Sequence, residues 1–409
     1  MLENELYAEL DVPTVINASG TKTRIGGSRI RPEAVEAMAT AAESFVRLSD
    51  LQAAASDRIA DITGAEAGYV ANGAAGALLL AAAACIATDD PGVMADLPDT
   101  DDVPDEIVMP RTHRMGYDHA LRAAGATIVD VGTNDRYLGT GARDVEPWEY
   151  AHAIGEDTVA VAHVYKAYGT PALEEVCDIA HEHDVPVIVD AAAELPPVSN
   201  LSWFTEQGAD LVAFSGGKGI RGPQTTGILA GRADLIESAA FQHLDMHAAD
   251  EVWDPPRNLL DPDAIDGVPK QGIGRPLKVG KEELVGLLTA LDAFIEEDHE
   301  ETRAEWRERA TEIATALDDL TGLETTIEDG AKSVSPTVVV AVNEATVGAT
   351  TATIVGSLRR ERPRIFLGAD DLADRQFTVS PMCLTDEEAE YVTERIAATV
   401  ESAPDMAER

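Results

Sequence analysis

Basic residues are scarce in this sequence. Its 409 residues include 31 lysines and arginines against 74 aspartates and glutamates, which gives a formal net charge of −43 at pH 7. Contacts to nucleic-acid phosphates depend on lysine and arginine, so no nucleic-acid partner is expected. The 45% hydrophobic content argues against disorder. We interpret the chain as a folded protein with the acidic surface of a halophilic protein, whose self-repulsion a salt-rich cytosol would screen.

Cysteines and long apolar runs are also few. The N-terminus has no signal-peptide hydrophobic region, and the apolar run 74–87 is too short for a membrane span. His243 and His247 stand four residues apart, but no HExxH pattern surrounds them, so no metal site is expected. The cysteines form no CxxC pair, which indicates a reducing compartment and hence the cytoplasm. There are three of them, Cys85, Cys177 and Cys383.

A glycine-rich turn that carries one lysine separates two apolar runs in the stretch LVAFSGGKGIRGPQTTGILA, residues 211–230. The glycines remove side chains from around Lys218, so the chain can turn sharply and a ligand can approach the backbone. A lysine there would be partly desolvated, which favours the neutral, nucleophilic amine. The phosphate loop of nucleotide triphosphatases is excluded, because its upstream glycine and the Ser/Thr after its lysine are missing.

An acidic residue ends the apolar run PVIVD, 28 residues before the lysine. The interval between Asp190 and Lys218 has room for one βαβ unit with a helix around 201–207. Both residues would then stand at the carboxyl ends of neighbouring parallel strands, where open α/β sheets bind ligands. A Schiff-base lysine with an aspartate for the pyridinium nitrogen is the signature of a pyridoxal phosphate enzyme. The alternative is an ordinary loop lysine and strand-end acid beside some other ligand.

A second small-residue turn occurs in YVANGAAGALLL, residues 69–80. The pattern predicts a short strand that runs through this turn into an alanine-rich helix. Free N–H groups and the helix dipole favour an anion there, and small side chains leave room for it. We therefore assign Gly73, Ala74, Ala75 and Gly76 to the phosphate of the cofactor. A dinucleotide turn is the rival interpretation, but Gly-Ala-Ala-Gly does not match GxGxxG.

The alternation of strand and helix patterns along the chain predicts an α/β protein. We expect an irregular segment over 1–35, a loop over 88–106 and a single helix from Glu282 to about Leu320. The expected domains are an N-terminal segment (1–45) that contributes to the active site and to the small domain, a large cofactor-binding domain (46–280) and a small C-terminal α/β domain (281–409).

Three segments carry a resemblance to a known family. VDAAAELPP at Asp190, FSGGKGIRGPQ at Lys218 and GRPLKVGKEE at Arg275 resemble the selenocysteine synthase-like branch of fold-type I pyridoxal phosphate enzymes. This aminotransferase class V-like branch also contains the D-glucosaminate-6-phosphate ammonia-lyases. The similarity runs through nearly the whole chain. It implies pyridoxal 5'-phosphate as cofactor, a large domain with a mostly parallel seven-stranded type of sheet, and a site formed in a homodimer or higher homo-oligomer.

Polar residues beside these motifs are further candidates for the site. His113 follows a predicted strand end, where its ring could stack on the cofactor, and the resemblance favours this role. Arg111, close by, could meet an anionic group of the substrate. Ser215, Gln224 and Thr225 flank the lysine turn and are expected to contact the cofactor.

Substrate binding is expected from basic and polar residues outside the two turns. Arg275 is the first choice for a carboxylate clamp, because a planar guanidinium matches a carboxylate with two hydrogen bonds. In the family that the chain resembles, the N-terminal segment crosses over the active site. That makes Asn17, Thr21 and Arg24 candidate substrate contacts; the alternative is a surface turn.

The resemblance makes α,β-elimination from an amino acid or amino sugar acid the expected reaction. Lys218 would hold the cofactor, Asp190 would keep the pyridine nitrogen protonated, and the freed lysine would take the Cα proton. A β-hydroxyl would leave, and a 2-keto acid and ammonia would be released. Aminotransfer, β-replacement and racemisation use the same residues, and spacing does not separate them. A non-catalytic relative that binds phosphate metabolites is the alternative outside the enzymes.

Overall fold

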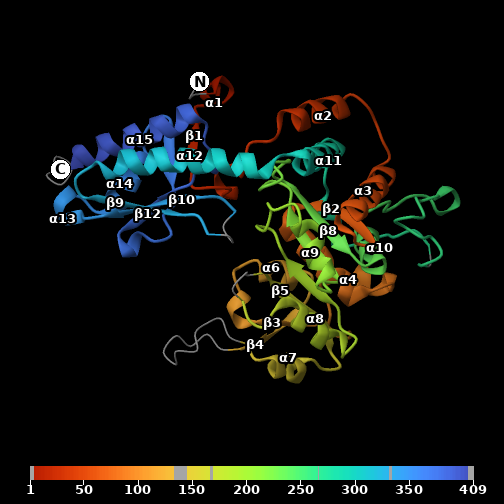
Figure 1. Cartoon of the computed structure of the whole chain (residues 1–409). Coiled ribbons are helices and arrows are strands. Elements are labelled where there is room, and N and C mark those ends of the chain that lie inside the picture. Colours follow the sequence, from red (N-terminus) through yellow and green to blue (C-terminus); the bar gives the residue numbers. More distant parts are fainter. Residues whose placement is uncertain (1–3, 133–144, 166–168, 266, 331–333, 404–409) are drawn as a thin grey trace. The chain divides into compact units, whose positions relative to one another are not determined.

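A seven-stranded sheet dominates the part of the chain from Ile30 to Glu296 (Figure 1). The computed structural model describes residues 4–132, 145–165, 169–265, 267–330 and 334–403. Strand β8 is antiparallel to both of its neighbours, and the other pairings are parallel. The spatial order is β2 (Ala67–Asn72), β8 (Thr226–Gly231), β7 (Leu211–Ser215), β6 (Val187–Asp190), β5 (Thr158–Val164), β3 (Glu106–Pro110) and β4 (Thr127–Val131). The predicted α/β class with a mostly parallel seven-stranded sheet is confirmed.

Both faces of this sheet are buried. Alternate side chains of β6 enter two different cores: Ile188 packs on one face, and Val187 and Val189 pack on the other. This arrangement explains why the parallel strands are apolar throughout instead of alternating with polar residues. The helices of this unit are α2 (Pro32–Ala42), α3 (Leu48–Thr63), α4 (Gly73–Ala87), α5 (Pro91–Asp96), α6 (Asp118–Ala123), α7 (Pro147–Ala153), α8 (Leu173–His181), α9 (Asn200–Glu206), α10 (Ala233–Phe241) and α11 (Lys281–Glu296).

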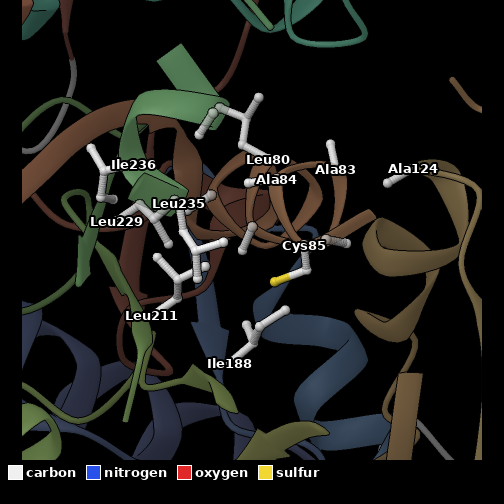
Figure 2. Close-up of a cluster of buried hydrophobic side chains, with 14 of the residues drawn as sticks. Leu80, Ala83, Ala84, Cys85, Ala124, Ile188, Leu211, Leu229, Leu235 and Ile236 are labelled. Atoms are coloured by element: carbon white, nitrogen blue, oxygen red, sulfur yellow. The ribbon is translucent and has the colours of Figure 1, made fainter. Parts of the chain in front are cut away.

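Helix α4 is the central helix on one face. Its alanines are small enough for the helix to contact β6, β7 and β8 together. Figure 2 shows Leu80 and Cys85 of this helix among Ile188, Leu211 and Leu229 of the sheet. Burial raises the pKa of the Cys85 thiol to about 12, so the side chain behaves as a small apolar residue of the core.

A second compact unit consists of Met1–Arg29 and Glu297–Arg409. Its three-stranded antiparallel sheet has the order β12 (Gln376–Val379), β10 (Thr337–Val342) and β9 (Leu323–Glu328). Strand β1 (Val15–Ala18) pairs in parallel with β11 (Arg364–Leu367). The helices are α1 (Glu5–Glu9), α12 (His299–Asp318), α13 (Glu344–Val347), α14 (Thr351–Leu358) and α15 (Asp386–Glu401). None of the helices that the structure describes is long and apolar enough to cross a bilayer.

The boundary between the units differs from the expected domain limits. Helices α2 and α11 pack against each other, so 30–45 and 281–296 both belong to the unit of the large sheet. The expected single helix from Glu282 to about Leu320 is in fact two helices. The Asp298 side chain caps the start of α12 by accepting hydrogen bonds from the N–H groups of Glu300 and Glu301. These bonds start a new helix, so the helical stretch is interrupted after α11.

Two segments expected to be irregular contain regular elements. Val15–Ala18 is a strand because a distant partner, β11, supplies its ladder bonds. The expected loop 88–106 contains α5, where the Asp90 side chain accepts from the first N–H groups and Pro91 occupies the first turn. In both cases a specific hydrogen-bonding partner outweighs the polar, glycine- or proline-rich composition of the segment.

Candidate active site

Lys218 lies half-buried in the turn that joins β7 to β8. The turn is closed by a hydrogen bond from the Arg221 N–H to the Lys218 carbonyl at 3.0 Å. Gly219 is packed directly against another loop, since a Cβ placed on it would lie 2.8 Å from the carbonyl carbon of Leu195. Glycine is therefore required by this close backbone contact, which fixes the path of the turn around the lysine.

Asp190 is the last residue of β6, the neighbour of β7. The two strands are parallel, and Asp190 stands opposite Ala213 in their register. The predicted placement of Asp190 and Lys218 at the same end of neighbouring parallel strands is thereby confirmed. One oxygen of the half-buried carboxylate accepts from the Ala192 N–H at 3.0 Å, which fixes the orientation of the side chain.

The turn at the start of α4 has the properties of an anion cradle. The first N–H groups of a helix have no partners within the helix, and the Asn72 side chain makes no capping bond to them. Gly73 has a φ of +67°, and a Cβ placed on it would meet nothing within 4 Å. Strand β8 lies directly against this turn: a Cβ on Gly227 would lie 2.5 Å from the Gly73 oxygen and 2.6 Å from the Ala74 nitrogen. These features fit a phosphate group, because backbone donors and small side chains converge at one helix start.

The close contact between Gly227 and the α4 turn predicts the effect of one added methyl group. Gly227→Ala must displace either β8 or the turn, and overpacking of this kind costs about 1–3 kcal/mol of unfolding free energy. We expect a lower melting temperature and at least about tenfold weaker retention of the expected cofactor, pyridoxal phosphate, measured by thermal unfolding and by equilibrium dialysis. Gly155→Ala is the matched control, because a Cβ there would meet nothing within 4 Å. Equal cofactor retention by the two variants would contradict this account of the turn.

His113 is held in place by the neighbouring strand. It ends the short helix η2 (Arg111–His113) after β3, and its Nδ1 accepts from the Val164 N–H at 3.2 Å. The His163 ring packs edge-on against it, with 4.6 Å between ring centroids. Burial, and then the charge of His113, lowers the pKa of His163 to about 3, so His163 is a neutral core residue. Its Nδ1 has no hydrogen-bond partner within the described chain, so it is a core histidine with one unsatisfied nitrogen.

The three polar residues that flank the lysine turn have different environments. Ser215 is half-buried at the end of β7, opposite Gly227, and Gln224 is half-buried beside the turn. The hydroxyl of Thr225 donates to the Glu283 carboxylate at 2.8 Å. A carboxylate repels a phosphate, so the expected contact of Thr225 with the cofactor would compete with Glu283.

Arg111 is engaged in an ion pair. Its guanidinium lies 2.6 Å from Asp130, and Arg114 bridges the same carboxylate to Asp118. The guanidinium of Arg114 holds the pKa of Asp118 below its usual range even though burial acts the other way. The charge of Arg111 is thus balanced within the β3–β4 region, and a substrate anion would have to compete with Asp130.

The three N-terminal candidates belong to the unit of Met1–Arg29 and Glu297–Arg409, whereas Lys218 belongs to the other unit. Asn17 braces its own loop, because its amide donates to the Gly20 carbonyl at 2.8 Å and its oxygen accepts from the Ser19 N–H at 3.0 Å. These bonds are the side-chain contacts of a turn, which is the alternative to a substrate contact for Asn17. Thr21 is half-buried, and Arg24 is exposed and has no hydrogen bond or ion pair among the described residues.

Arg275 lines a cavity of about 570 Å³ within the unit of the large sheet. It lies on the short helix η6 (Arg275–Leu277), and neither its side chain nor that of Lys278 has a hydrogen-bond or ion-pair partner among the residues that the structure describes. Both carboxylates at the cavity are engaged. Asp245 pairs with Arg47, and Glu283 accepts from Thr225 and from a backbone N–H. The cavity is lined by Val46, Leu48, His243, Leu244, Asp245, Met246, Arg275, Lys278, Val279, Gly280, Lys281 and Glu283.

Unpaired cations are unusual on a chain with a net charge of −43, and their convergence in one cavity favours an anionic ligand. Sequence reasoning selected Arg275 but assigned no role to Lys278, although the motif GRPLKVG places the two residues three positions apart. It also weighed His243 only as a metal ligand. The described residues contain no group of three or more potential metal ligands.

Comparisons with known proteins show the family and the fold to which the chain is similar. The family model SelA, L-seryl-tRNA selenium transferase, matches residues 15–247. The chain is 32% identical over 398 residues to a 5'-C-glycyluridine monooxygenase-decarboxylase from a Streptomyces species, a match that covers 95% of this chain and 90% of that protein. It is 29% identical over 409 residues to D-glucosaminate-6-phosphate ammonia lyase of Salmonella typhimurium, covering 98% and 99% of the two chains. A solved structure of D-glucosaminate-6-phosphate ammonia-lyase superposes with a TM-score of 0.80 at 28% identity, over 98% of this chain and 100% of the other.

Proposed function

We propose a reaction for this chain from the premise that it belongs to the L-seryl-tRNA selenium transferase (SelA) family and is a pyridoxal phosphate-dependent enzyme of fold type I. The proposed reaction is an α,β-elimination. The substrate would be a hydroxylated amino acid or amino sugar acid, and the products a 2-keto acid and ammonia. One observation carries the choice. A solved structure of D-glucosaminate-6-phosphate ammonia-lyase superposes on 98% of this chain with a TM-score of 0.80, a match that continues past the end of the family model at residue 247 and so includes Arg275.

The described residues fit the cofactor. The α4 turn would bind its phosphate, the Lys218 amine would hold it covalently, and the Asp190 carboxylate would face its ring nitrogen. When bound, pyridoxal phosphate supplies an electron sink that stabilises negative charge at the Cα of the substrate. Ser215, Gln224 and His113 would border it, and the hydrogen bond from the Val164 N–H of β5 would fix the position of the His113 ring.

The chain's own residues would then bind the substrate and move its protons. Arg275 and Lys278 would bind an anionic group and set the orientation of the substrate. Lys218, once its amine is released from the cofactor, would take the Cα proton as general base. Loss of a β-hydroxyl would follow, and hydrolysis of the resulting enamine would give the keto acid and ammonia. Thr21 and Arg24 of the N-terminal segment, whose side chains have no hydrogen bond or ion pair among the described residues, stay candidates for further substrate contacts.

A product screen tests the reaction directly. The holoenzyme is incubated at high salt with hydroxylated amino acids and amino sugar acids, and ammonia and keto acid are measured together. We expect equal amounts of the two products without any added amino-group acceptor. Transfer of the amino group to an added keto acid, with no ammonia released, would contradict the elimination and would indicate an aminotransferase.

Oxidative decarboxylation is a second candidate, favoured by the 32% identity to the monooxygenase-decarboxylase over 95% of this chain. It differs from elimination in needing molecular oxygen and releasing carbon dioxide. The same screen is therefore run in an oxygen electrode and repeated under anaerobic conditions. Oxygen consumption together with carbon dioxide release would replace the lyase assignment.

We further propose a cytoplasmic homodimer. Phe45, between α2 and α3, is fully exposed in the single chain, and its neighbour Val46 lines the Arg275 cavity. An apolar pair at the rim of a candidate site is suited to a contact with a second copy. Light scattering at high salt should give twice the chain mass of 43.4 kDa; a monomeric mass would contradict the assembly.

A further inference from the structure

Tyr69 and His243 form a buried pair behind the Arg275 cavity. Tyr69 lies on β2, is fully buried, and its hydroxyl is 2.5 Å from Nδ1 of His243. His243 follows α10, is 6% exposed, and lines the cavity that holds Arg275 and Lys278. The hydrogen bond between them therefore connects a buried residue of the large sheet to a histidine that lines the same cavity as Arg275 and Lys278.

The direction of this hydrogen bond fixes the tautomer of the imidazole. Burial raises the pKa of Tyr69 far above its usual range, so the phenol keeps its proton. Among the described residues, Nδ1 of His243 is the acceptor that this buried hydroxyl meets, so we assign the phenol O–H as the donor of the hydrogen bond to Nδ1. Burial, and then the charge of Arg275, lowers the pKa of His243 to about 4, so the ring is neutral at physiological pH. A neutral imidazole whose Nδ1 accepts a hydrogen bond carries its single proton on Nε2.

Nε2 is the ring nitrogen of His243 that is available to a ligand in the cavity. This atom has no hydrogen-bond partner within the described chain, and it is not among the fully buried polar atoms that lack one. A histidine that lines a cavity, and whose Nδ1 is taken by Tyr69, presents Nε2–H as its only available donor. The tyrosine thus sets which hydrogen-bonding group His243 offers.

Two glycines bring Arg275 against this histidine. A Cβ on Gly274 would lie 2.8 Å from the Gln242 carbonyl oxygen and 3.1 Å from Cβ of His243, and a Cβ on Gly272 would be still closer to the same oxygen. The backbone before Arg275 therefore lies directly on the backbone before His243. This contact explains why the motif GIGRPLK begins with two glycines, and it places the donor of His243 and the guanidinium at one cavity.

We propose that His243, held by Tyr69 as the Nε2–H tautomer, donates a hydrogen bond to the oxyanion that Arg275 and Lys278 bind, and that it acts as a neutral positioning residue for this group. The oxyanion is a phosphate or carboxylate of the substrate, so the inference rests on the proposed function and specifies the substrate class of the site. A neutral donor adds a hydrogen bond without a third charge, and hydrogen bonds to charged groups are among the stronger ones.

Sulfate is a suitable probe, because it is a tetrahedral oxyanion that does not titrate near neutral pH. Its affinity for the full-length holoenzyme is measured by calorimetry at fixed ionic strength. We expect binding to the wild type, and roughly tenfold or greater losses in Arg275→Gln and in His243→Leu. His243→Gln, whose amide can donate in place of Nε2–H, should keep affinity within about threefold, and His183→Gln on the exposed surface should leave it unchanged. No sulfate binding, or equal binding by folded His243→Leu, would overturn the proposal.

The tautomer has its own readout, which does not depend on activity. Nitrogen-15 NMR of histidine-labelled protein should show His243, assigned by its absence in His243→Gln, as neutral with the proton on Nε2 at pH 7. Tyr69→Phe removes the donor to Nδ1 and should give a mixture of tautomers with weaker sulfate binding. An imidazolium, or an Nδ1–H ring in the wild type, would overturn the proposal.

The pH dependence distinguishes a neutral donor from a charged one. The titratable and charged groups around the ring are Tyr69, Asp245, Arg275, Lys278, Lys281 and Glu283. Sulfate affinity should change less than about twofold between pH 6.5 and 8, because the pKa of His243 lies well below this range. A steep gain on acidification would identify an imidazolium as the ligand and contradict the proposal.

Competition identifies the chemical source of the oxyanion. Inorganic phosphate and acetate are titrated against bound sulfate, and the stronger competitor shows whether the site suits a phosphate or a carboxylate. Failure of both to displace sulfate would overturn the site. If sulfate binding and the tautomer are as expected but no keto acid is released, the elimination fails and the anion site stands.

Discussion

Lys218→Ala should abolish catalysis and covalent attachment of the cofactor. The variant removes the only amine that we assign to hold pyridoxal phosphate and to take the Cα proton. General base catalysis alone contributes about 10²- to 10⁴-fold to rates, so kcat should fall by at least that factor. The visible absorbance of the lysine-bound cofactor should disappear from the purified protein.

The control for this variant is Lys270→Ala. Lys270 is exposed and contacts Asp250 at 3.3 Å, outside the groups assigned to the reaction. It should keep the visible band and the activity of the wild type. Persistence of the band in Lys218→Ala would remove this lysine from its role and would point to an amine elsewhere in the chain.

Asp190→Asn should lower kcat by at least about 100-fold while leaving the fold intact. The amide oxygen of asparagine can still accept from the Ala192 N–H, so the side chain keeps its orientation. What is lost is the negative charge that keeps the ring nitrogen protonated and draws charge away from Cα. The measurements are steady-state kinetics, the absorbance of the bound cofactor and the melting temperature.

Asp178→Asn on the exposed side of α8 makes the same chemical change away from the site. It should match the wild type in rate and in melting temperature. An Asp190→Asn enzyme within about threefold of the wild-type kcat would show that the charge of Asp190 is not used, and the assignment of the ring-nitrogen partner would be wrong.

The centre of the site could be predicted from sequence because its determinants are local. The glycines around Lys218 and the apolar run before Asp190 each specify a turn or a strand end within a few residues. The handedness and connectivity of a βαβ unit then leave few ways to place the two strands, and β6 and β7 are parallel neighbours as expected. The same holds for α4, whose small-residue start and alanine-rich body are contiguous.

The errors arose where one hydrogen-bonding partner, either a distant strand or a single capping residue, outweighs the average composition of a segment. Val15–Ala18 becomes a strand only because β11 pairs with it. Helix α5 needs the cap from Asp90, and Asp298 separates α11 from α12, so single polar residues outweigh the average composition around them.

The Tyr69–His243 pair had no signal in the sequence. The two residues are 174 positions apart, and neither lies in a recognisable motif for the other. Only the fold brings β2 next to the turn after α10. Likewise, the pairing of Arg111 with Asp130 and of Thr225 with Glu283 depends on tertiary contacts, so sequence reasoning overestimated how available these two side chains are.

Chemical trapping tests the assignment of the lysine most directly. The holoenzyme is reduced with borohydride, digested and mapped by mass spectrometry, so that the residue bearing the cofactor is identified. The account predicts a phosphopyridoxyl group on Lys218, in the peptide that contains SGGKGIR. An unmodified Lys218, with the label on another residue or on none, would contradict it.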